Sequence, residues 1–478
     1  MTISTAWERT TPPPPVRAVH LGLGAFHRAH QVWATQRAND AATAAGARPD
    51  ELWGYASFTG RSPRSADALR TQDGRYTLLV RSADGDHPEV VDALVEVHDG
   101  ADGDAWRRLF ATPAVALVTL TVTEAGYVRT ADGRLDRDHP DLVADVALLT
   151  ASSVTPSGAA ATTAPGRLVD GLRARAAAAA GPIAVIPCDN LPDNGAVVRR
   201  VVLDLARSVD PELASWIETH VSFVSTMVDR ITPATTPDDV AQVAALTGRA
   251  DASPVVTEPF AEWVLAGDFP AGRPRWEEAG ARFVADIAVH EQRKLWLLNP
   301  GHSLLAYRGI ELGLSTIAEA FADPTCRALL ERLWDEARPV LPLPAAEVDA
   351  ALAALRARFA NARIEHRLAQ IAKDGAAKLP VRVVAPAGAR LASGLPVGVA
   401  QARTIAAWIR HLETTDADLA TTDAGARELA ARLHDLPAGP DAAAARADLA
   451  LDLLDPDATA TPLREAVARA LTDPSATP

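Results

Sequence analysis

The sequence predicts an α/β protein with a Rossmann-like, doubly wound, mostly parallel sheet and a second, mainly α-helical C-terminal domain. First, a short apolar strand at 16–21 runs into Gly22-Leu23-Gly24 and then into an alanine-rich helical stretch. Second, apolar runs alternate with helical patterns through the first half of the chain, as in parallel sheets. Third, only helical patterns follow a Pro- and Gly-rich stretch at 268–275. We therefore expect an N-terminal dinucleotide-binding domain over 1–280 and a helical substrate and catalytic domain over 281–478.

The expected elements follow in order along the chain. Strands are predicted at 16–21, 52–58, 76–81, 93–97, 115–122, 183–187 and 220–227, with helices near 25–45, 104–110 and 196–208. The C-terminal part predicts helices at 304–322, 325–337, 345–359, 364–373, 400–412 and 423–433. The polar tail from about residue 455 contains prolines, so we expect it to fray.

Composition excludes several classes of protein. The chain has 478 residues and a formal net charge of -14, which repels phosphate backbones and argues against a nucleic-acid partner. No apolar stretch is long enough for a membrane span or a signal peptide, so we expect a cytoplasmic protein without a membrane partner. The 2 cysteines exclude a disulfide scaffold and a multi-cysteine metal site, and no bound metal is expected. The oligomeric state is not readable from the sequence.

Lysine is scarce in this chain. Only Lys294, Lys373 and Lys378 are lysines, so 44 of the 47 basic residues (47 minus 3) are arginines. Arginine serves equally well on a solvated surface, but it cannot lose a proton near neutral pH, whereas lysine can. A retained lysine is therefore a candidate general base. The alternative is that the nucleotide composition of the gene depletes lysine and leaves a few at random positions.

The Gly22-x-Gly24 turn is typical of a dinucleotide-binding loop, although His27 occupies the third glycine position. The two glycines let the backbone approach a pyrophosphate, and the following helix offers free N–H groups, with Arg28 available for phosphate. The segment after the second strand carries Arg61 and no acid for the adenosine ribose. NADP is therefore not excluded, and a simple tight turn is the alternative.

A second group of rare residues lies between 291 and 302. Lys294 stands beside the apolar run 296–298, and burial there would lower the pKa of its ammonium group toward that of a general base. Asn299 can donate to a developing oxyanion, and His302 follows three residues later. Pro300 is expected to break the helix at Asn299 and turn these side chains toward a cleft. The alternative is an amphipathic helix whose lysine reaches water.

The strand at 183–187 ends in a polar turn that contains Asn190. Ligand-binding residues of open α/β sheets lie at the carboxyl ends of strands, so Asn190 is a second candidate oxyanion donor. A turn-forming role is the alternative. Cys188 is expected to be a small core residue because no histidine lies near it in the sequence.

With these motifs together, the chain resembles the polyol-specific long-chain dehydrogenase family (mannitol dehydrogenase family), which includes mannitol 2-dehydrogenases and the fructuronate reductases, or D-mannonate oxidoreductases. The resemblance runs from residue 19 to about residue 412. Its motifs stand at 20–31, 72–77, 121–127, 188–195, 227–233, 258–260, 269–274, 294–302 and 374–380. It departs from the family at Pro300, where family members usually have glycine.

The resemblance implies a zinc-independent oxidoreductase that uses NAD. It implies Lys294 as general base, Asn190 and Asn299 as oxyanion-stabilising groups, His302 as the substrate-positioning histidine, and Glu291 as the group that passes the proton to water. The implied cofactor-binding residues are Gly22, Gly24, Phe26, His27, Arg28, Arg61, Thr123, Glu124 and Asp229. The implied substrate-binding residues are Asn190, Asp229, Arg230, Lys294, His302, Lys378 and Arg382.

The sequence therefore predicts hydride transfer between NAD(H) and a secondary alcohol or ketone of a six-carbon sugar acid or polyol. D-Mannonate and D-fructuronate are favoured because Lys378 and Arg382 offer cationic partners for a carboxylate. The alternatives are a mannitol 2-dehydrogenase, a catalytically inactive cofactor-binding homologue and a zinc-dependent polyol dehydrogenase. The active site is expected in a cleft between the domains, with Lys294 and Asn190 within roughly 10 Å of one another.

Overall fold

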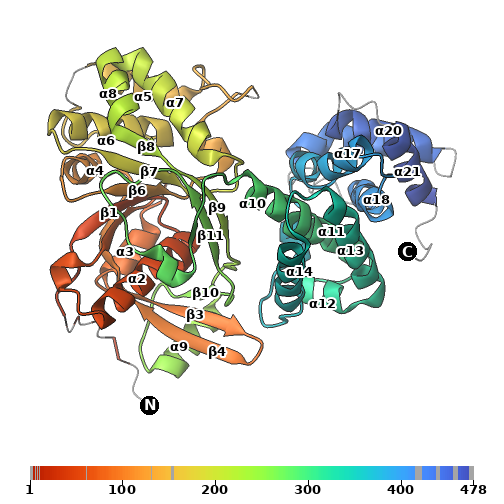
Figure 1. Cartoon of the computed structure of the whole chain (residues 1–478), viewed down its shortest axis with the longest axis horizontal. Helices are drawn as coiled ribbons and strands as arrows, with labels where there is room; N and C mark the ends of the chain where they lie inside the picture. Colours follow the sequence, from red (N-terminus) through yellow and green to blue (C-terminus); the bar gives the residue numbers. More distant parts are fainter. Residues whose placement is uncertain are drawn as a thin grey trace. The chain divides into compact units, whose positions relative to one another are not determined.

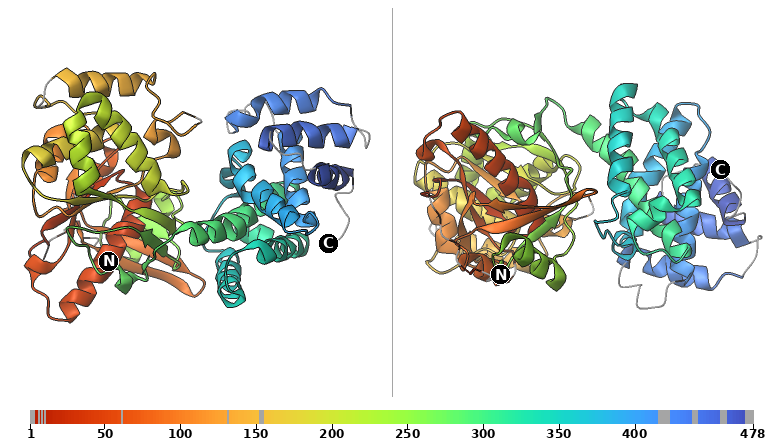
Figure 2. Two further views of the ribbon diagram at one scale, coloured as in Figure 1. Left: turned by 45° about the horizontal axis from the view of Figure 1, so that its top comes forward. Right: turned by 90° about the horizontal axis from the view of Figure 1, so that it is seen from below.

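A computed structural model of the chain describes residues 4, 5, 7, 9, 11–60, 62–130, 132–151, 155–414, 423–437, 442–455 and 461–472. The chain divides into two compact units, Met1–Ala288 and Val289–Pro478. The first unit is α/β and the second is helical (Figure 1, Figure 2). Each unit has its own buried apolar residues. The predicted fold class is confirmed.

A six-stranded, wholly parallel sheet forms the centre of the first unit. Its order is β5-β2-β1-β6-β7-β8, so the chain adds strands first on one side of β1 and then on the other. This is the order of doubly wound dinucleotide-binding folds. The strands are β1 (Val16–Leu21), β2 (Gly54–Phe58), β5 (Leu94–His98), β6 (Leu117–Leu120), β7 (Ile183–Pro187) and β8 (Val221–Phe223).

Helices cover both faces of this sheet, which explains why its strands are apolar runs rather than alternating ones. On one face, Val19 and Leu21 pack with Trp106, Leu168 and Val198 of the helices above them. The helices of that layer in Figure 1 include α4 (Gly103–Phe110), α5 (Pro140–Ala151), α6 (Ala164–Ala177), α7 (Asn194–Val209) and α8 (Pro211–His220). The other face packs against the continuous helix formed by α1 (Ala25–His27), η1 (Arg28–Val32) and α2 (Trp33–Ala44).

Two smaller sheets complete the first unit, and they correct the predicted single sheet. The run at 76–81 is β3 (Tyr76–Ser82), which forms an antiparallel hairpin with β4 (Gly85–Val91) and a parallel pair with β10 (Val255–Thr257). The run at 220–227 is two strands, because β9 (Ser225–Asp229) leaves the main sheet to pair with β11 (Glu262–Ala266). The remaining elements are η2 (Pro49–Glu51), α3 (Arg64–Arg70), η3 (Glu124–Tyr127), α9 (Pro237–Thr247), η4 (Trp276–Ala279) and β12 (Arg282–Phe283).

The second unit is built on α11 (Asn299–Glu311), α13 (Pro324–Ala337) and α18 (Val399–Thr414), which contact one another around buried Trp334 and Trp408. Its other helices are α10 (Ala288–Arg293), η5 (Lys294–Leu298), α12 (Ile317–Ala322), η6 (Arg338–Val340), α14 (Ala345–Phe359), α15 (Leu368–Ile371), α16 (Gly375–Leu379), η7 (Pro380–Val384), α17 (Ala385–Ala392), η9 (Ala424–Ala426), α19 (Arg427–His434), α20 (Ala443–Leu454) and α21 (Thr461–Thr472). No described helix is both long and apolar enough to cross a membrane.

Two sequence expectations for this unit are wrong. The single helix expected at 304–322 is interrupted, because Gly313 adopts a left-handed conformation (φ +74°) between α11 and α12. In the described part of the tail, residues 461–472 form α21, which packs against α18 and α20 with Leu463 and Val467 buried.

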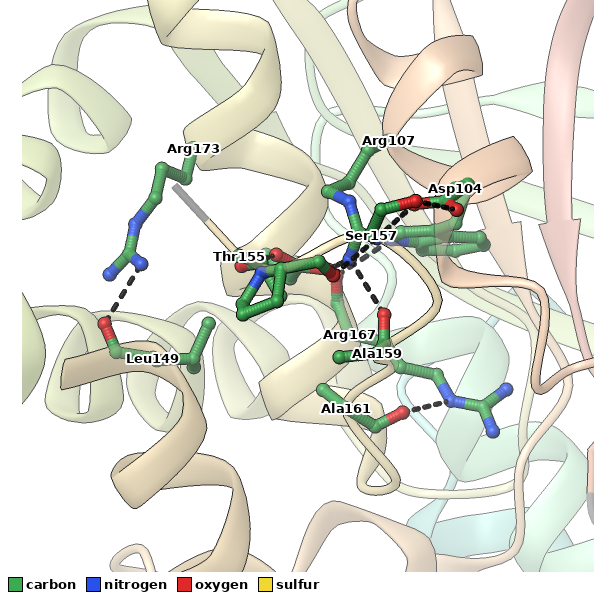
Figure 3. A network of polar contacts seen from close by, with 12 residues as sticks. Asp104, Arg107, Leu149, Thr155, Ser157, Ala159, Ala161, Arg167 and Arg173 are labelled. Atoms are coloured by element: carbon green, nitrogen blue, oxygen red, sulfur yellow. Dashed lines mark hydrogen bonds and ion pairs between the residues drawn. The ribbon is translucent and has the colours of Figure 1, made fainter. Parts of the chain in front are cut away.

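Figure 3 shows a polar network that fixes the loop at 155–163 to α4 and α6. The guanidinium of Arg107 donates to the carbonyl of Ala159 at 2.9 Å, to Asp170 at 2.9 Å and to Asp104 at 2.6 Å. The side chain of Asp170 is only 3% exposed, and its other carboxylate oxygen accepts from Thr155 at 2.5 Å. Arg107 therefore compensates a buried charge.

Arg107→Met should lower the free energy of unfolding by about 3 kcal/mol, because it removes the arginine and leaves a buried carboxylate. Urea denaturation followed by circular dichroism would measure the change. Arg108→Met is the matched control, since the Arg108 side chain is 57% exposed and its ion pair with Glu96 contributes little. Equal destabilisation by the two substitutions would contradict the assigned role.

Candidate functional site

In the first unit, several predicted cofactor residues and the predicted oxyanion donor Asn190 follow the carboxyl ends of neighbouring parallel strands. Gly22 and Gly24 follow β1, Thr123 and Glu124 follow β6, and Asn190 follows β7. The direction of chain winding reverses between β1 and β6, and open α/β sheets bind their ligands at this point. Thr123, Glu124 and Asn190 are all exposed there.

The Gly22-x-Gly24 turn has the geometry that a dinucleotide requires. Gly22 has φ +108°, and a Cβ on it would lie 2.2 Å from the carbonyl oxygen of Thr121, so no other residue fits. A Cβ on Gly24 would meet only the Gly22 carbonyl within 4 Å, at 3.6 Å, which leaves the approach to the helix open. No side chain caps this helix at Gly24. Its first N–H groups therefore suit a pyrophosphate.

A buried histidine network lies directly beneath this turn. The rings of His20 and His27 stack with centroids 3.3 Å apart and planes 3° apart. The Nε2 of His20 lies 3.0 Å from Thr121 Oγ1, which donates to the carbonyl of Gly22 at 2.8 Å. The Nδ1 of His20 lies 2.7 Å from Thr119 Oγ1. The network thus ties the glycine turn to the segment after β6.

These contacts determine the tautomer of each ring. Thr121 uses its proton on Gly22, so His20 donates from Nε2 and accepts from Thr119 at Nδ1. His27 donates from Nδ1 to Gln31 Oε1 at 3.2 Å and accepts from Ser57 at Nε2. Both rings are therefore neutral. Burial lowers the pKa of His20 to about 3 and holds the pKa of His27 well below its usual value.

Acid should weaken the fold through His20. The pKa of His20 is near 3 in the folded chain and about 6.5 in the unfolded chain. The contribution of the neutral ring to the free energy of unfolding is therefore fully present above about pH 6.5 and is lost as the pH falls toward 3. The loss is about 1.4 kcal/mol per pH unit for one proton. Unfolding free energies measured in urea between pH 7 and 4 should have a shallower slope for His20→Asn than for the natural chain. Parallel slopes would show that His20 does not contribute.

Two predicted arginines are held by backbone carbonyls. The guanidinium of Arg28 bonds the carbonyls of Ser253 and Gly24 and lies over the ring of Tyr76. Arg230 bonds the carbonyls of Ala29 and Glu258 and lies 4.3 Å from the ring of Trp33. Burial lowers the pKa of Arg230 to about 10. Both side chains brace the helix that follows the glycine turn.

The remaining predicted residues of the first unit are Asp229, Phe26 and Arg61. Asp229 ends β9 and pairs in register with Glu262, so it belongs to a smaller sheet. Phe26 stacks on His30 with ring centroids 5.1 Å apart. Arg61 lies outside the described residues.

Asn190 lies in a turn whose neighbours are firmly bonded. Asp189 accepts from the hydroxyl of Tyr127 and from the backbone N–H of Leu191. Asn194 exchanges two hydrogen bonds with the backbone of Thr226, at 2.8 and 3.0 Å. Burial raises the pKa of Asp189. These bonds fix the backbone on both sides of the exposed Asn190.

In the second unit, Pro300 does not break the helix, and this corrects the expectation. Asn299 has φ -65° and ψ -42°, and the chain stays helical from α10 through η5 into α11. The disturbance is instead a π turn at η5, in which the N–H of Asn299 donates to the carbonyl of Lys294, five residues back. The wider turn accommodates a proline, which has no N–H and cannot make the usual bond.

This π turn aligns the predicted catalytic side chains. At about 100° per residue, a regular α-helix would point Asn299 about 140° and His302 about 80° away from Lys294. A π turn adds one residue without adding a turn, which reduces these angles to about 40° and about 20°. Glu291, three residues earlier, lies about 60° away. One helix face therefore carries all four residues.

A second π turn carries Arg382. At η7 the N–H of Ala385 donates to the carbonyl of Pro380, and Pro386 follows as Pro300 follows η5. Arg382 donates to the carbonyl of Asn299 at 3.4 Å and to Ser303 Oγ at 3.2 Å. The two π turns are thus bonded to each other, and π turns are frequent at functional sites.

The other predicted cation in this unit, Lys378, bonds backbone carbonyls at and just beyond the end of the preceding helix. The ammonium of Lys378 donates to the carbonyl of Lys373 at 2.5 Å and to that of Ile371 at 3.4 Å.

The histidine network was missed by sequence reasoning, although a signal existed. Three of the chain's 12 histidines, His20, His27 and His30, stand within residues 20–30. In the part of the chain that the structure describes, no three His, Cys, Asp or Glu side chains group as metal ligands would. Cys188 is buried, as expected.

Comparison with known proteins gives consistent matches over nearly the whole chain. A family model described as the mannitol dehydrogenase Rossmann domain matches residues 16–278, and one described as the mannitol dehydrogenase C-terminal domain matches residues 286–469. The "uncharacterized oxidoreductase YeiQ" of Escherichia coli K12 is 38% identical over 409 residues, 84% of this chain and 80% of that protein. D-Mannonate oxidoreductase of the same strain is 36% identical over 413 residues, with the same shares.

A solved structure is also similar. The mannitol 2-dehydrogenase of Pseudomonas fluorescens, in a ternary complex with NAD and D-mannitol, is 31% identical with a TM-score of 0.79. The match covers 96% of this chain and 91% of that one.

The doubly wound sheet, its open glycine turn and these matches define an oxidoreductase and support a nicotinamide cofactor. The chain belongs to the mannitol dehydrogenase family, whose members act on polyols or sugar acids.

Proposed function

We propose that this protein transfers a hydride between NAD(H) and a secondary alcohol or ketone of a six-carbon sugar acid or polyol. The observation that carries the proposal is the π turn at η5, which places Glu291, Lys294, Asn299 and His302 on one helix face. NAD, when bound, supplies the hydride acceptor. In alcohol oxidation, neutral Lys294 takes the hydroxyl proton, and Glu291 passes it on to water.

In this proposal, the amides of Asn190 and Asn299 donate hydrogen bonds to the substrate oxygen while it carries negative charge. Neutral His302 positions the substrate. A structure with NADH and substrate bound would test this arrangement. A separation above roughly 10 Å between Lys294 and Asn190 would contradict it, since both must reach one carbon atom through hydrogen-bonding groups.

D-Mannonate and D-fructuronate are the proposed substrate pair. The positive charges of Arg358 and Arg382 act on His302, so two arginine charges lie near the aligned helix face and would attract a carboxylate. The similarity to D-mannonate oxidoreductase supports the same choice. Mannitol and fructose are the second candidates, favoured by the similarity to the mannitol 2-dehydrogenase structure.

A substrate panel decides between these candidates. Fructuronate, tagaturonate, fructose and fructose phosphate would be reduced with NADH and with NADPH, before and after exhaustive chelation. The highest kcat/KM should belong to fructuronate, and chelation should leave it unchanged. Activity on none of the four would favour an inactive cofactor-binding protein, and loss on chelation would favour a metal-dependent enzyme.

NAD is the proposed cofactor, with NADP as the alternative. The second strand, β2, ends without an acid of its own, but Asp99 follows the adjacent β5 and lies 3.4 Å from Thr59 Oγ1 at the end of β2. A carboxylate there suits ribose hydroxyls and repels a 2′-phosphate. A lower KM and a higher kcat with NADPH would reverse this choice.

A further inference from the structure

A second histidine faces His302 in the helical unit. His366 lies between α14 and α15, and its ring is edge-on to that of His302, with centroids 4.9 Å apart and planes at 79°. Phe359, the last residue of α14, lies 4.9 Å from the His302 ring. His366 is therefore next to the helix face that the π turn creates.

The backbone holds His366 in place. Its carbonyl accepts from the N–H of Ile317 at 3.0 Å, and its own N–H donates to the carbonyl of Ile364 at 2.8 Å. Arg367 forms a β-bridge with Thr316, the residue that caps α12. The position of the imidazole is thus set by the packing of α12 and α15 rather than by bonds of the ring itself.

Each ring has a buried nitrogen without a hydrogen-bond partner. Among the residues that the structure describes, nothing bonds His302 Nε2 or His366 Nδ1, although both atoms are buried. Buried polar atoms are nearly always bonded, because an unsatisfied one costs roughly 1–3 kcal/mol. Two such atoms on facing rings beside a predicted catalytic lysine indicate a place for a polar ligand.

The surroundings keep both rings neutral. Burial lowers the pKa of His366 to about 4, and the charge of Arg358 acts in the same direction. Burial also holds the pKa of His302 well below its usual value, reinforced by His366 and then by Arg358, Arg382 and Lys294. A neutral imidazole has one donor and one acceptor nitrogen. A hydroxyl group, which donates and accepts, matches that pair better than a carboxylate, which only accepts.

We propose that His366 is a substrate-binding residue, which with His302 forms a two-histidine site for hydroxyl groups of the sugar chain. The proposal rests on the proposed function, since it places the substrate beside Lys294 and Asn299. In this arrangement the arginines take the acid end of the substrate and the neutral imidazoles take hydroxyls. His366 thereby contributes to selection among polyhydroxy substrates.

The test compares three substitutions at His366, using the best substrate from the panel. His366→Phe keeps a ring and removes both nitrogens, so KM should rise about tenfold while kcat and the KM for NADH change less than twofold. His366→Asn places an amide where Nδ1 lies and should recover most of the affinity. His366→Gln, which mimics Nε2 instead, should not. His434→Phe, at an exposed histidine, is the matched control and should leave all constants unchanged.

Stability measurements separate binding from folding. If the His366 variants lower the urea midpoint but leave the substrate KM unchanged, His366 is only structural and the proposal is wrong. An equal KM for the Asn and Gln variants would also contradict it, because the assignment is to Nδ1. Lys294→Ala, assayed alongside, isolates the proposed function. If Lys294→Ala is active, the proposed function is wrong. If Lys294→Ala is inactive and His366→Phe has the KM of the natural chain, only the two-histidine site is wrong.

Discussion

Lys294→Arg should be nearly as inactive as Lys294→Ala, with kcat lower by about two to four orders of magnitude. Arginine keeps the positive charge and hydrogen-bond donors of lysine, but it does not release a proton at working pH. If Lys294 served only to attract or anchor the substrate, arginine would replace it well. The comparison therefore distinguishes a base from an electrostatic anchor.

The measurement is turnover of the natural chain and both variants across pH. Oxidation by the natural enzyme should rise with pH until Lys294 is neutral, and the variants should lose this dependence. Small amines added to Lys294→Ala should restore part of the rate. Lys373→Arg, at an exposed lysine, is the control. Retention of roughly a tenth of normal turnover by Lys294→Arg, with an unchanged pH profile, would refute the mechanism.

Asn299→Ala and Asn190→Ala should each lower kcat by about 100- to 1,000-fold with little change in KM. The reason is that an oxyanion donor acts on charge that is present only in the transition state. If both amides bond the same oxygen, the fold-decrease in kcat of the double variant should be smaller than the product of the two single fold-decreases. Multiplicative losses, or losses confined to KM, would show that the two asparagines act at separate places.

The sequence predicted the core of the dinucleotide fold because its signals are local. The apolar β1, the glycines at 22 and 24 and the helix after them are contiguous, and each depends on backbone sterics or burial. Which strands pair with one another is not determined by local sequence. The runs at 76–81 and 220–227 have ordinary strand composition, and nothing in them shows that β3 and β9 leave the main sheet.

The sequence predicted which residues form the candidate site, but it did not predict how they are arranged on the helix. Lys294, Asn299 and His302 stood out through lysine scarcity and resemblance, yet a spacing of five residues puts Asn299 about 140° from Lys294 on a regular α-helix. Pro300 was the only visible sign of an irregular turn, and it led to the wrong expectation of a break. The backbone carbonyls that Arg28 and Lys378 bond could not be predicted either, because the carbonyl that a long side chain reaches depends on packing that only the fold creates.

In the proposed mechanism, the π turn at η5 makes catalysis depend on the number of residues between Lys294 and Asn299. On a regular α-helix with the natural spacing of five residues, the side chain of Asn299 would point about 140° away from that of Lys294. Removing any one residue between the two would remove the π turn and keep the four aligned residues in the chain, and the remaining spacing would place the two side chains about 40° apart on a regular α-helix. In the proposed site, the number of residues between Lys294 and Asn299 must therefore match the helix geometry, and it matters as much as the identity of the side chains at its ends.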